Sequence, residues 1–105
     1  MTRAQGSDAK MKICFMEMDD RTRQSMSLVI KHRMGGAVVL AEAEAADIAV
    51  LDLDHSNALA SYRSLRERRA DMRAIGLTSN ADREDEGLIV LRKPISANHL
   101  LGAIQ

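Results

Sequence analysis

Five short apolar runs recur along the chain, each followed by a polar or amphipathic segment. The runs are rich in isoleucine, valine and leucine, and polar residues do not alternate with apolar ones within them. They span residues 13–16, 37–40, 48–51, 74–77 and 88–91. Short continuous apolar runs are typical of strands that are buried on both faces, as in a parallel sheet covered by helices. The pattern therefore predicts the five strands of a parallel sheet.

Three of the segments between and after the runs carry apolar residues at helical spacing. In chain order these residues are Met26, Val29, Ile30 and Met34, then Ala58, Tyr62 and Leu65, and last Leu100, Leu101 and Ile104. We expect Gly35 and Gly36 to end the first helix and Ser96 to cap the start of the last one. The sequence therefore predicts helices after the first, third and fifth strands.

Two of the connections are too short for a full helix. Residues 41–47 form a link of seven residues, and residues 79–87 form one of nine, five of them charged, whereas a parallel crossover normally needs about a dozen or more. We expect the second and fourth helices to be short or missing. The predicted fold is a doubly wound α/β domain, flavodoxin-like, with a five-stranded parallel sheet in the order 2-1-3-4-5. We expect it to cover residues 11–105, with residues 1–10 as a disordered polar tail.

Composition argues against several classes of protein. Lysine plus arginine equals aspartate plus glutamate at 15 each, and Phe15 and Tyr62 are the only large aromatic residues, which argues against binding of nucleic acid. Cys14 is the only cysteine, so the chain has no disulfide framework and no cysteine zinc cluster. No apolar stretch approaches the ~20 residues of a bilayer span, and residues 1–10 lack the apolar segment of a signal peptide. We expect a cytoplasmic protein that does not contact the membrane.

Polar side chains follow four of the predicted strands. They are Glu17, Asp19 and Asp20 after the first, Asp52 and Asp54 at the third, Thr78 and Ser79 after the fourth, and Lys93 after the fifth. Because the carboxyl ends of parallel strands meet at one edge of a sheet, we expect these groups to share a shallow pocket. Such a set suits phosphoryl transfer to a carboxylate: acids hold Mg²⁺, the metal and lysine neutralise the phosphoryl oxygens, and a hydroxyl hydrogen-bonds one of them.

The chain resembles the receiver domain of two-component response regulators over nearly all of residues 12–104. Asp52, at the end of ADIAVLDLD, matches the phosphoacceptor aspartate of that family. Thr78, in AIGLTSN, matches the hydroxyl residue that reorients on phosphorylation. Lys93, in VLRKP, matches the lysine that contacts the phosphoryl group, and Pro94 matches a proline typical of that junction. The resemblance implies a signalling module rather than an enzyme, with Mg²⁺ as cofactor and a sensor kinase or other signalling protein as partner.

The acidic pocket departs from the family pattern. The family has two adjacent acids after its first strand, and here that pair falls on Glu17 and Met18. A thioether is a poor magnesium ligand, so the resemblance implies weak or absent Mg²⁺ binding at Glu17 and Asp52, to which the carbonyl of Asp54 could contribute. Asp19 is the next acid that could enter the pocket, but a register that uses Asp19 and its neighbour spoils the helix match.

Other departures favour a degenerate receiver, or pseudo-receiver. Val90 replaces the aromatic switch residue, and His55-Ser56 replaces a Met-Pro pair. We therefore expect weak or absent phosphorylation of Asp52 and signalling through protein–protein contacts. We also expect an output domain downstream in the full-length chain, and a homodimer that pairs the apolar faces left thin by the missing helices.

Alternatives stay open at this point. The chain could be a fully phosphorylatable receiver, a structural dimerisation domain, or a small flavodoxin-like nucleotide-binding protein or enzyme, although neither G-x-G-x-x-G nor G-x-x-x-x-G-K-[ST] occurs. Asp52 could be an ordinary strand-end acid, and Lys93 could form a purely structural ion pair. His55 lies near two aspartates, but a lone loop histidine is more often solvated than bound to metal. The arginines of residues 63–73 read as a solvated helix face that could also dock an acidic partner.

Overall fold

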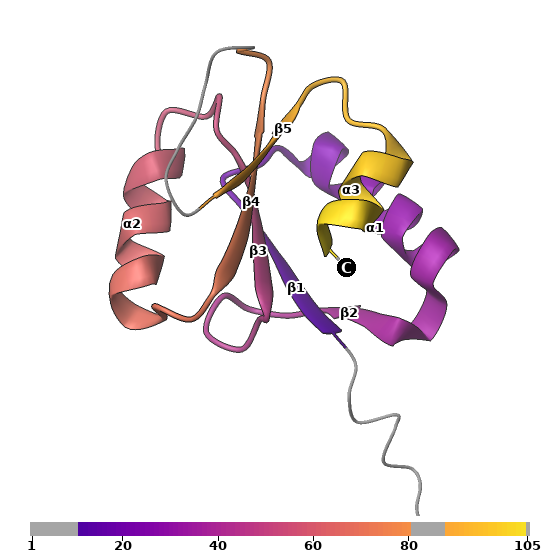
Figure 1. The fold of residues 1–105 in the computed structure, drawn as a ribbon, viewed down its shortest axis with the longest axis horizontal. Coiled ribbons are helices and arrows are strands. Elements are labelled where there is room, and N and C mark those ends of the chain that lie inside the picture. Colours follow the sequence, from indigo (N-terminus) through magenta and orange to yellow (C-terminus); the bar gives the residue numbers. More distant parts are fainter. Residues whose placement is uncertain (1–10, 81–87, 105) are drawn as a thin grey trace, which may run out of the picture.

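A five-stranded parallel sheet forms the centre of the molecule (Figure 1). The structure, a computed structural model, describes residues 11–80 and 88–104. Its strands are β1 (Met11–Met16), β2 (Val38–Leu40), β3 (Ile48–Asp52), β4 (Arg73–Thr78) and β5 (Ile89–Arg92). They lie in the order β2-β1-β3-β4-β5, and every adjacent pair is parallel. The predicted sheet and its strand order are confirmed.

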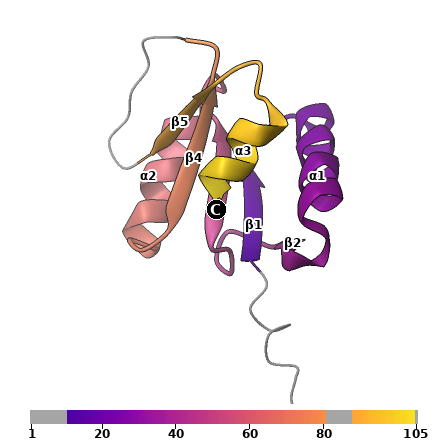
Figure 2. The ribbon, with the colours of Figure 1, turned by 45° about the vertical axis from the view of Figure 1, so that its right-hand side comes forward.

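Three helices cover the two faces of the sheet. They are α1 (Asp20–Met34), α2 (Ala58–Arg68) and α3 (Ala97–Ile104), and a short 3₁₀ turn, η2 (Gly35–Ala37), follows α1. Helices α1 and α3 lie on one face and α2 lies on the other (Figures 1 and 2). This is the arrangement of a doubly wound α/β domain, as the sequence predicted. None of the helices in the described ranges is long and apolar enough to cross a membrane.

Alternate residues of the strands pack into two separate hydrophobic cores, one on each face of the sheet. Ile13 and Val50 belong to the cluster that packs under α1 and α3, whereas the next residue along each strand, Cys14 or Leu51, belongs to the cluster under α2. This is the two-residue period of side chains along a strand. Because both faces are covered, the strands need apolar residues at consecutive positions, which explains the continuous apolar runs in the sequence.

The helix ends follow local sequence signals. The carboxylate of Asp19 accepts a hydrogen bond from the Thr22 backbone N–H at 2.7 Å and so caps the start of α1. Gly35 ends that helix with φ 58°, a left-handed conformation that glycine adopts at little cost. The Ser96 hydroxyl accepts a hydrogen bond from the His99 backbone N–H at 3.1 Å, so Ser96 caps α3 as predicted.

The connection between β2 and β3 contains no helix. Residues 41–47 make a turn in which the Ala45 N–H bonds to the Glu42 carbonyl, and Ala41 and Asp47 are tied to β1 by backbone hydrogen bonds. The prediction that the second helix is missing is confirmed. The predicted short fourth helix falls on residues 79–87, most of which lie outside the described residues.

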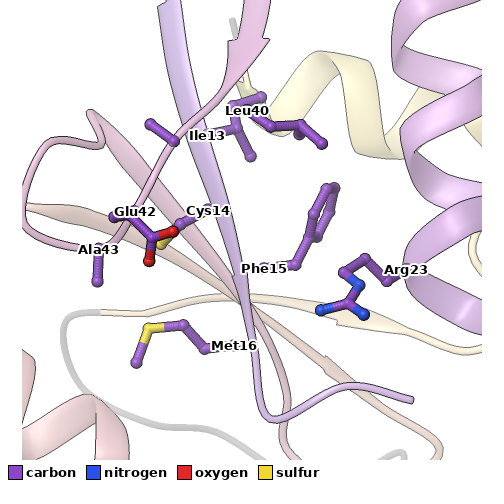
Figure 3. A pocket seen from close by; sticks show the side chains of 9 residues that line it. Ile13, Cys14, Phe15, Met16, Arg23, Leu40, Glu42 and Ala43 are labelled. Atoms are coloured by element: carbon purple, nitrogen blue, oxygen red, sulfur yellow. The ribbon is translucent and has the colours of Figure 1, made fainter. Parts of the chain in front are cut away.

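Beside this helix-free link, β1 borders a hollow of about 270 Å³. Figure 3 shows Cys14 and Met16 pointing to the same side of β1 as the link, and Phe15 pointing to the opposite side. Burial, followed by the charges of Glu44 and Glu42, raises the pKa of the Cys14 thiol to about 11. The thiol is therefore protonated at neutral pH and behaves as a small apolar group rather than a nucleophile.

Gly76, in the middle of β4, lies at a position where a larger side chain would clash with the core. A Cβ added there would lie 2.5 Å from Leu53 Cδ1 and 2.7 Å from Leu53 Cγ, and the Leu53 side chain is itself buried. We expect Gly76→Ala to lower the free energy of unfolding by about 1–3 kcal/mol, because the core must rearrange around the methyl group. Urea denaturation measures the change.

The matched control for this prediction is Gly102→Ala in α3. Nothing lies within 4 Å of a Cβ at Gly102, and alanine in a helix is favoured over glycine by roughly 0.5–1 kcal/mol. We expect this variant to be as stable as the wild type or more so. Equal stability of Gly76→Ala and wild type would contradict the close packing of β4 against Leu53.

Candidate functional site

The carboxyl ends of β3, β4 and β5 bring the predicted site residues together. Asp52 is the last residue of β3, Thr78 is the last residue of β4, and Lys93 follows β5. The loop after β5 is anchored by a hydrogen bond of 2.8 Å from the Lys93 backbone N–H to the Thr78 carbonyl. Asp52 and Thr78 are therefore held by the sheet, and Lys93 is held against its edge.

Lys93 and Asp52 form the ion pair at the centre of the site. The Lys93 Nζ lies 2.8 Å from Asp52 Oδ1, and the two side chains are 30% and 19% exposed, respectively. The backbone N–H of Asp54 donates to the same Asp52 oxygen at 3.0 Å. A partly buried carboxylate that faces an ammonium group is a candidate nucleophile, but this contact alone is also that of a structural ion pair.

Among the described residues of the site, the Asp54 side chain accepts the largest number of hydrogen bonds. The Thr78 hydroxyl donates to Asp54 Oδ1 at 2.8 Å, and the Ser79 backbone N–H and hydroxyl both donate to Oδ2 at 2.9 Å. The Lys93 Nζ lies 3.2 Å from the same Oδ2. The Thr78 hydrogen bond, followed by that from the Ser79 N–H, lowers the pKa of Asp54 well below its usual range.

Asp54 was predicted to lie at this edge, with its carbonyl as a possible metal ligand, but the contacts of its side chain with Thr78, Ser79 and Lys93 were not predicted. The available signal was spacing, because residues two apart at the end of a strand point to the same side of the sheet. Asp52 and Asp54 are two apart, but Asp54 lies beyond the end of β3, so this spacing alone does not decide which donors its side chain meets.

Lys93 is a cation shared between the two acids. Burial of its ammonium group lowers the pKa of Lys93, but the hydrogen bonds to Asp52 and Asp54 outweigh burial, and the pKa is raised overall. The side chain is therefore fully charged at neutral pH. This arrangement stabilises negative charge at the end of β3.

Glu17 lies beside α2. It has φ 49°, in the left-handed region, and its Oε2 accepts a hydrogen bond from the Ser61 hydroxyl of α2 at 2.9 Å. Its Oε1 lies 3.7 Å from His55 Nδ1. That nitrogen also accepts a hydrogen bond from the Asn57 backbone N–H at 3.2 Å.

Asp19 is engaged as the cap of α1. Its hydrogen bonds with Thr22, followed by the charge of Arg21, lower the pKa of Asp19. Its membership of the acidic pocket stays a prediction. Met18, between β1 and α1, packs against the core under α1 and α3.

The residues present do not form a good magnesium site. Within residues 11–80 and 88–104, no group of three or more histidine, cysteine, aspartate or glutamate residues is arranged to hold a metal ion. Asp52 and Asp54 are bound to Lys93, and Glu17 is bound to Ser61. Mg²⁺ requires several hard oxygen ligands in octahedral geometry, so an ion would have to displace existing contacts of these acids.

Comparison with known proteins bears on the fold. No protein-family model matches the sequence, and a comparison with curated proteins finds no match. Among solved structures, the chain is similar to a response regulator receiver domain protein from Bacillus halodurans, with a TM-score of 0.68 and 14% sequence identity. The match covers 90% of this chain and 94% of that one. The chain therefore has the fold of a response-regulator receiver domain, as its resemblance to that family implied.

Proposed function

We propose that the chain is a receiver-like signal-transduction module of a response regulator, which acts through protein–protein contacts and catalyses no metabolic reaction. The observation that carries the proposal is the contact of 2.8 Å between Lys93 Nζ and Asp52 Oδ1, beside Thr78, in a receiver fold. Its partners are a sensor kinase or another signalling protein, with an output domain downstream, in the cytoplasm.

We propose that Asp52 is a poor phosphoacceptor. In phosphorylation, an Asp52 oxygen would attack the phosphorus of the donor and form an O–P bond, while the leaving group departs with the electron pair of the bond that breaks. The donor is an anion and so is Asp52, so the reaction needs a cation to bring them together. Lys93 is already shared between two acids, and Met18 supplies no carboxylate for Mg²⁺. These contacts support a pseudo-receiver over a fully phosphorylatable receiver.

Exposed apolar side chains support a homodimer as part of this proposal. Leu28 of α1 and Leu40 of β2 are 68% and 50% exposed and line the same shallow hollow. The other residues that line this hollow are polar, and exposed apolar groups with a polar rim mark candidate interaction surfaces. Sedimentation equilibrium at high micromolar concentration is the measurement, and a strict monomer would contradict the dimer.

Labelling with a small-molecule phosphodonor tests the proposed function. We expect phosphoramidate and Mg²⁺ to phosphorylate only a small fraction of wild-type chains, measured by intact mass, and Asp52→Asn to remove that fraction. Asp71→Asn, which changes an exposed aspartate on a different loop, is the control and should label like the wild type. Labelling of most chains through Asp52 would establish a working receiver, whereas labelling that survives in Asp52→Asn would contradict the assignment of Asp52.

A further inference from the structure

Four hydrogen-bond donors converge on the carboxylate of Asp54. They are the Thr78 hydroxyl, the Ser79 backbone N–H, the Ser79 hydroxyl and the Lys93 ammonium group, at distances of 2.8 to 3.2 Å. The Thr78 side chain is completely buried, while Asp54 is 32% exposed. The Thr78 hydroxyl is thus buried at the floor of the site, whereas Ser79 is exposed and Lys93 is about as exposed as Asp54.

This donor set has the composition of an oxyanion-binding site. The site has one backbone N–H, two hydroxyls and one ammonium group, and all of them donate to the same anion. Donors of these kinds bind other oxyanions as well as carboxylates. Phosphate is a larger oxyanion of the same kind, with more oxygens to accept the same bonds. The chemical class of ligand that fits the site is therefore a tetrahedral oxyanion, which includes a phosphoryl group.

We propose that Asp54 is the resident ligand of this oxyanion site and competes with phosphate, or with a phosphoryl group on Asp52, for Thr78, Ser79 and Lys93. Asp54 is part of the same chain and lies beside these donors, so its effective concentration at the site is high compared with that of free phosphate. Asp52 shares Lys93 with Asp54, so a phosphoryl group on Asp52 would have to displace Asp54 from the ammonium group. For this consequence the inference rests on the proposed function.

The hydrogen bond from Thr78 to Asp54 determines the orientation of the Thr78 hydroxyl. The Thr78 hydroxyl donates to Asp54 and accepts a hydrogen bond of 3.1 Å from the Asn80 backbone N–H. Its proton and one of its two lone pairs are thus engaged, and these two hydrogen bonds orient the hydroxyl toward Asp54. Asp54 therefore holds this side chain in the position of a group that contacts an anion.

Titration with inorganic phosphate, without Mg²⁺ and followed by NMR of the backbone amides, tests the proposal. We expect Asp54→Ala to bind phosphate at least about tenfold more tightly than the wild type, with the largest shifts at Ser79. Asp71→Ala removes the same charge near the opposite end of β4, where the side chain is 81% exposed, and should bind like the wild type. Phosphate binding by Asp54→Ala that is no tighter than by Asp71→Ala would overturn the proposal.

Two further variants keep the test decisive. Adding Lys93→Met to Asp54→Ala should abolish the gain, and a gain that persists would show that phosphate binds elsewhere, which also overturns the proposal. If Asp54→Ala does not fold, Asp54→Asn keeps the shape of the side chain but not its charge. We expect it to bind phosphate several-fold more tightly than Asp71→Asn, and equal binding would overturn the proposal.

The outcome is separable from that of the proposed function. Inorganic phosphate binds without transfer to Asp52, so tighter binding by Asp54→Ala would support the oxyanion site even where most wild-type chains are labelled through Asp52, the result that contradicts the pseudo-receiver proposal. Labelling of only a small fraction of chains through Asp52, together with unchanged phosphate binding in Asp54→Ala, would support the pseudo-receiver proposal and overturn the role of Asp54.

Discussion

Met18→Asp should bind Mg²⁺ at least about tenfold more tightly than the wild type and should be phosphorylated faster by a small phosphodonor. The substitution adds a hard anionic ligand where the family pattern has an acid, and magnesium affinity increases with the charge and number of oxygen ligands. The gain is limited by Lys93, which holds Asp52 and Asp54 and must share them with the ion. NMR titration gives the dissociation constant, and intact mass gives the labelling rate.

The control for this substitution is Met18→Asn. The Met18 side chain packs against the core under α1 and α3, so either substitution loses apolar contacts and is expected to reduce stability by a similar amount. Only the aspartate adds a charge. If Met18→Asp and Met18→Asn bind Mg²⁺ equally, the missing carboxylate is not what weakens the metal site.

Lys93→Met should lower the free energy of unfolding at pH 7 by about 1–3 kcal/mol, because it leaves two partly buried carboxylates facing each other without a cation. Lys93 contacts Asp52 at 2.8 Å and Asp54 at 3.2 Å. The control is Lys31→Met, which removes an ammonium group from an exposed position of α1. We expect Lys31→Met to change stability by less than about 0.5 kcal/mol. Equal losses in the two variants would contradict a structural role for the shared cation.

The pH dependence of this loss has a defined sign. The folded-state pKa of Asp54 is lowered below its unfolded value of about 3.9, so Asp54 contributes stability above that pH, which is lost as pH falls through the folded pKa. The pKa of Lys93 is raised, so its contribution is present below its unfolded value of about 10.4 and is lost as pH rises through the folded pKa. The difference between wild type and Lys93→Met should therefore be largest near neutral pH, and urea unfolding at pH 3, 7 and 11 measures it.

The fold could be predicted because each of its causes is local in the sequence. Five apolar runs correspond to five strands that are covered on both faces, and the link of residues 41–47 is too short to hold a crossover helix. Asp52, Thr78 and Lys93 could be placed at one edge of the sheet because the carboxyl ends of parallel strands all lie at the same edge. The signal for the cap at Asp19 was also available, since Thr22 follows it by three residues.

The partners of the acidic side chains could not be predicted in the same way. Glu17 contacts Ser61 of α2, which is 44 residues away, across a backbone turn with positive φ. Asp54 lies beyond the end of β3, where the path of the loop determines which donors it meets. Such contacts depend on backbone direction and rotamers in loops, and hydrophobic periodicity carries no information about either.

We infer that Asp52 is a poor phosphoacceptor because the ammonium and hydroxyl groups of this site already contact the chain's own acids. The most direct measurement is the backbone amide NMR spectrum of the wild-type chain before and after addition of Mg²⁺ and phosphoramidate. We predict that the signals of Asp54, Ser79 and Lys93 stay in place for most molecules. Conversion of most molecules to a second set of signals at these residues, lost in Asp52→Asn, would contradict the account.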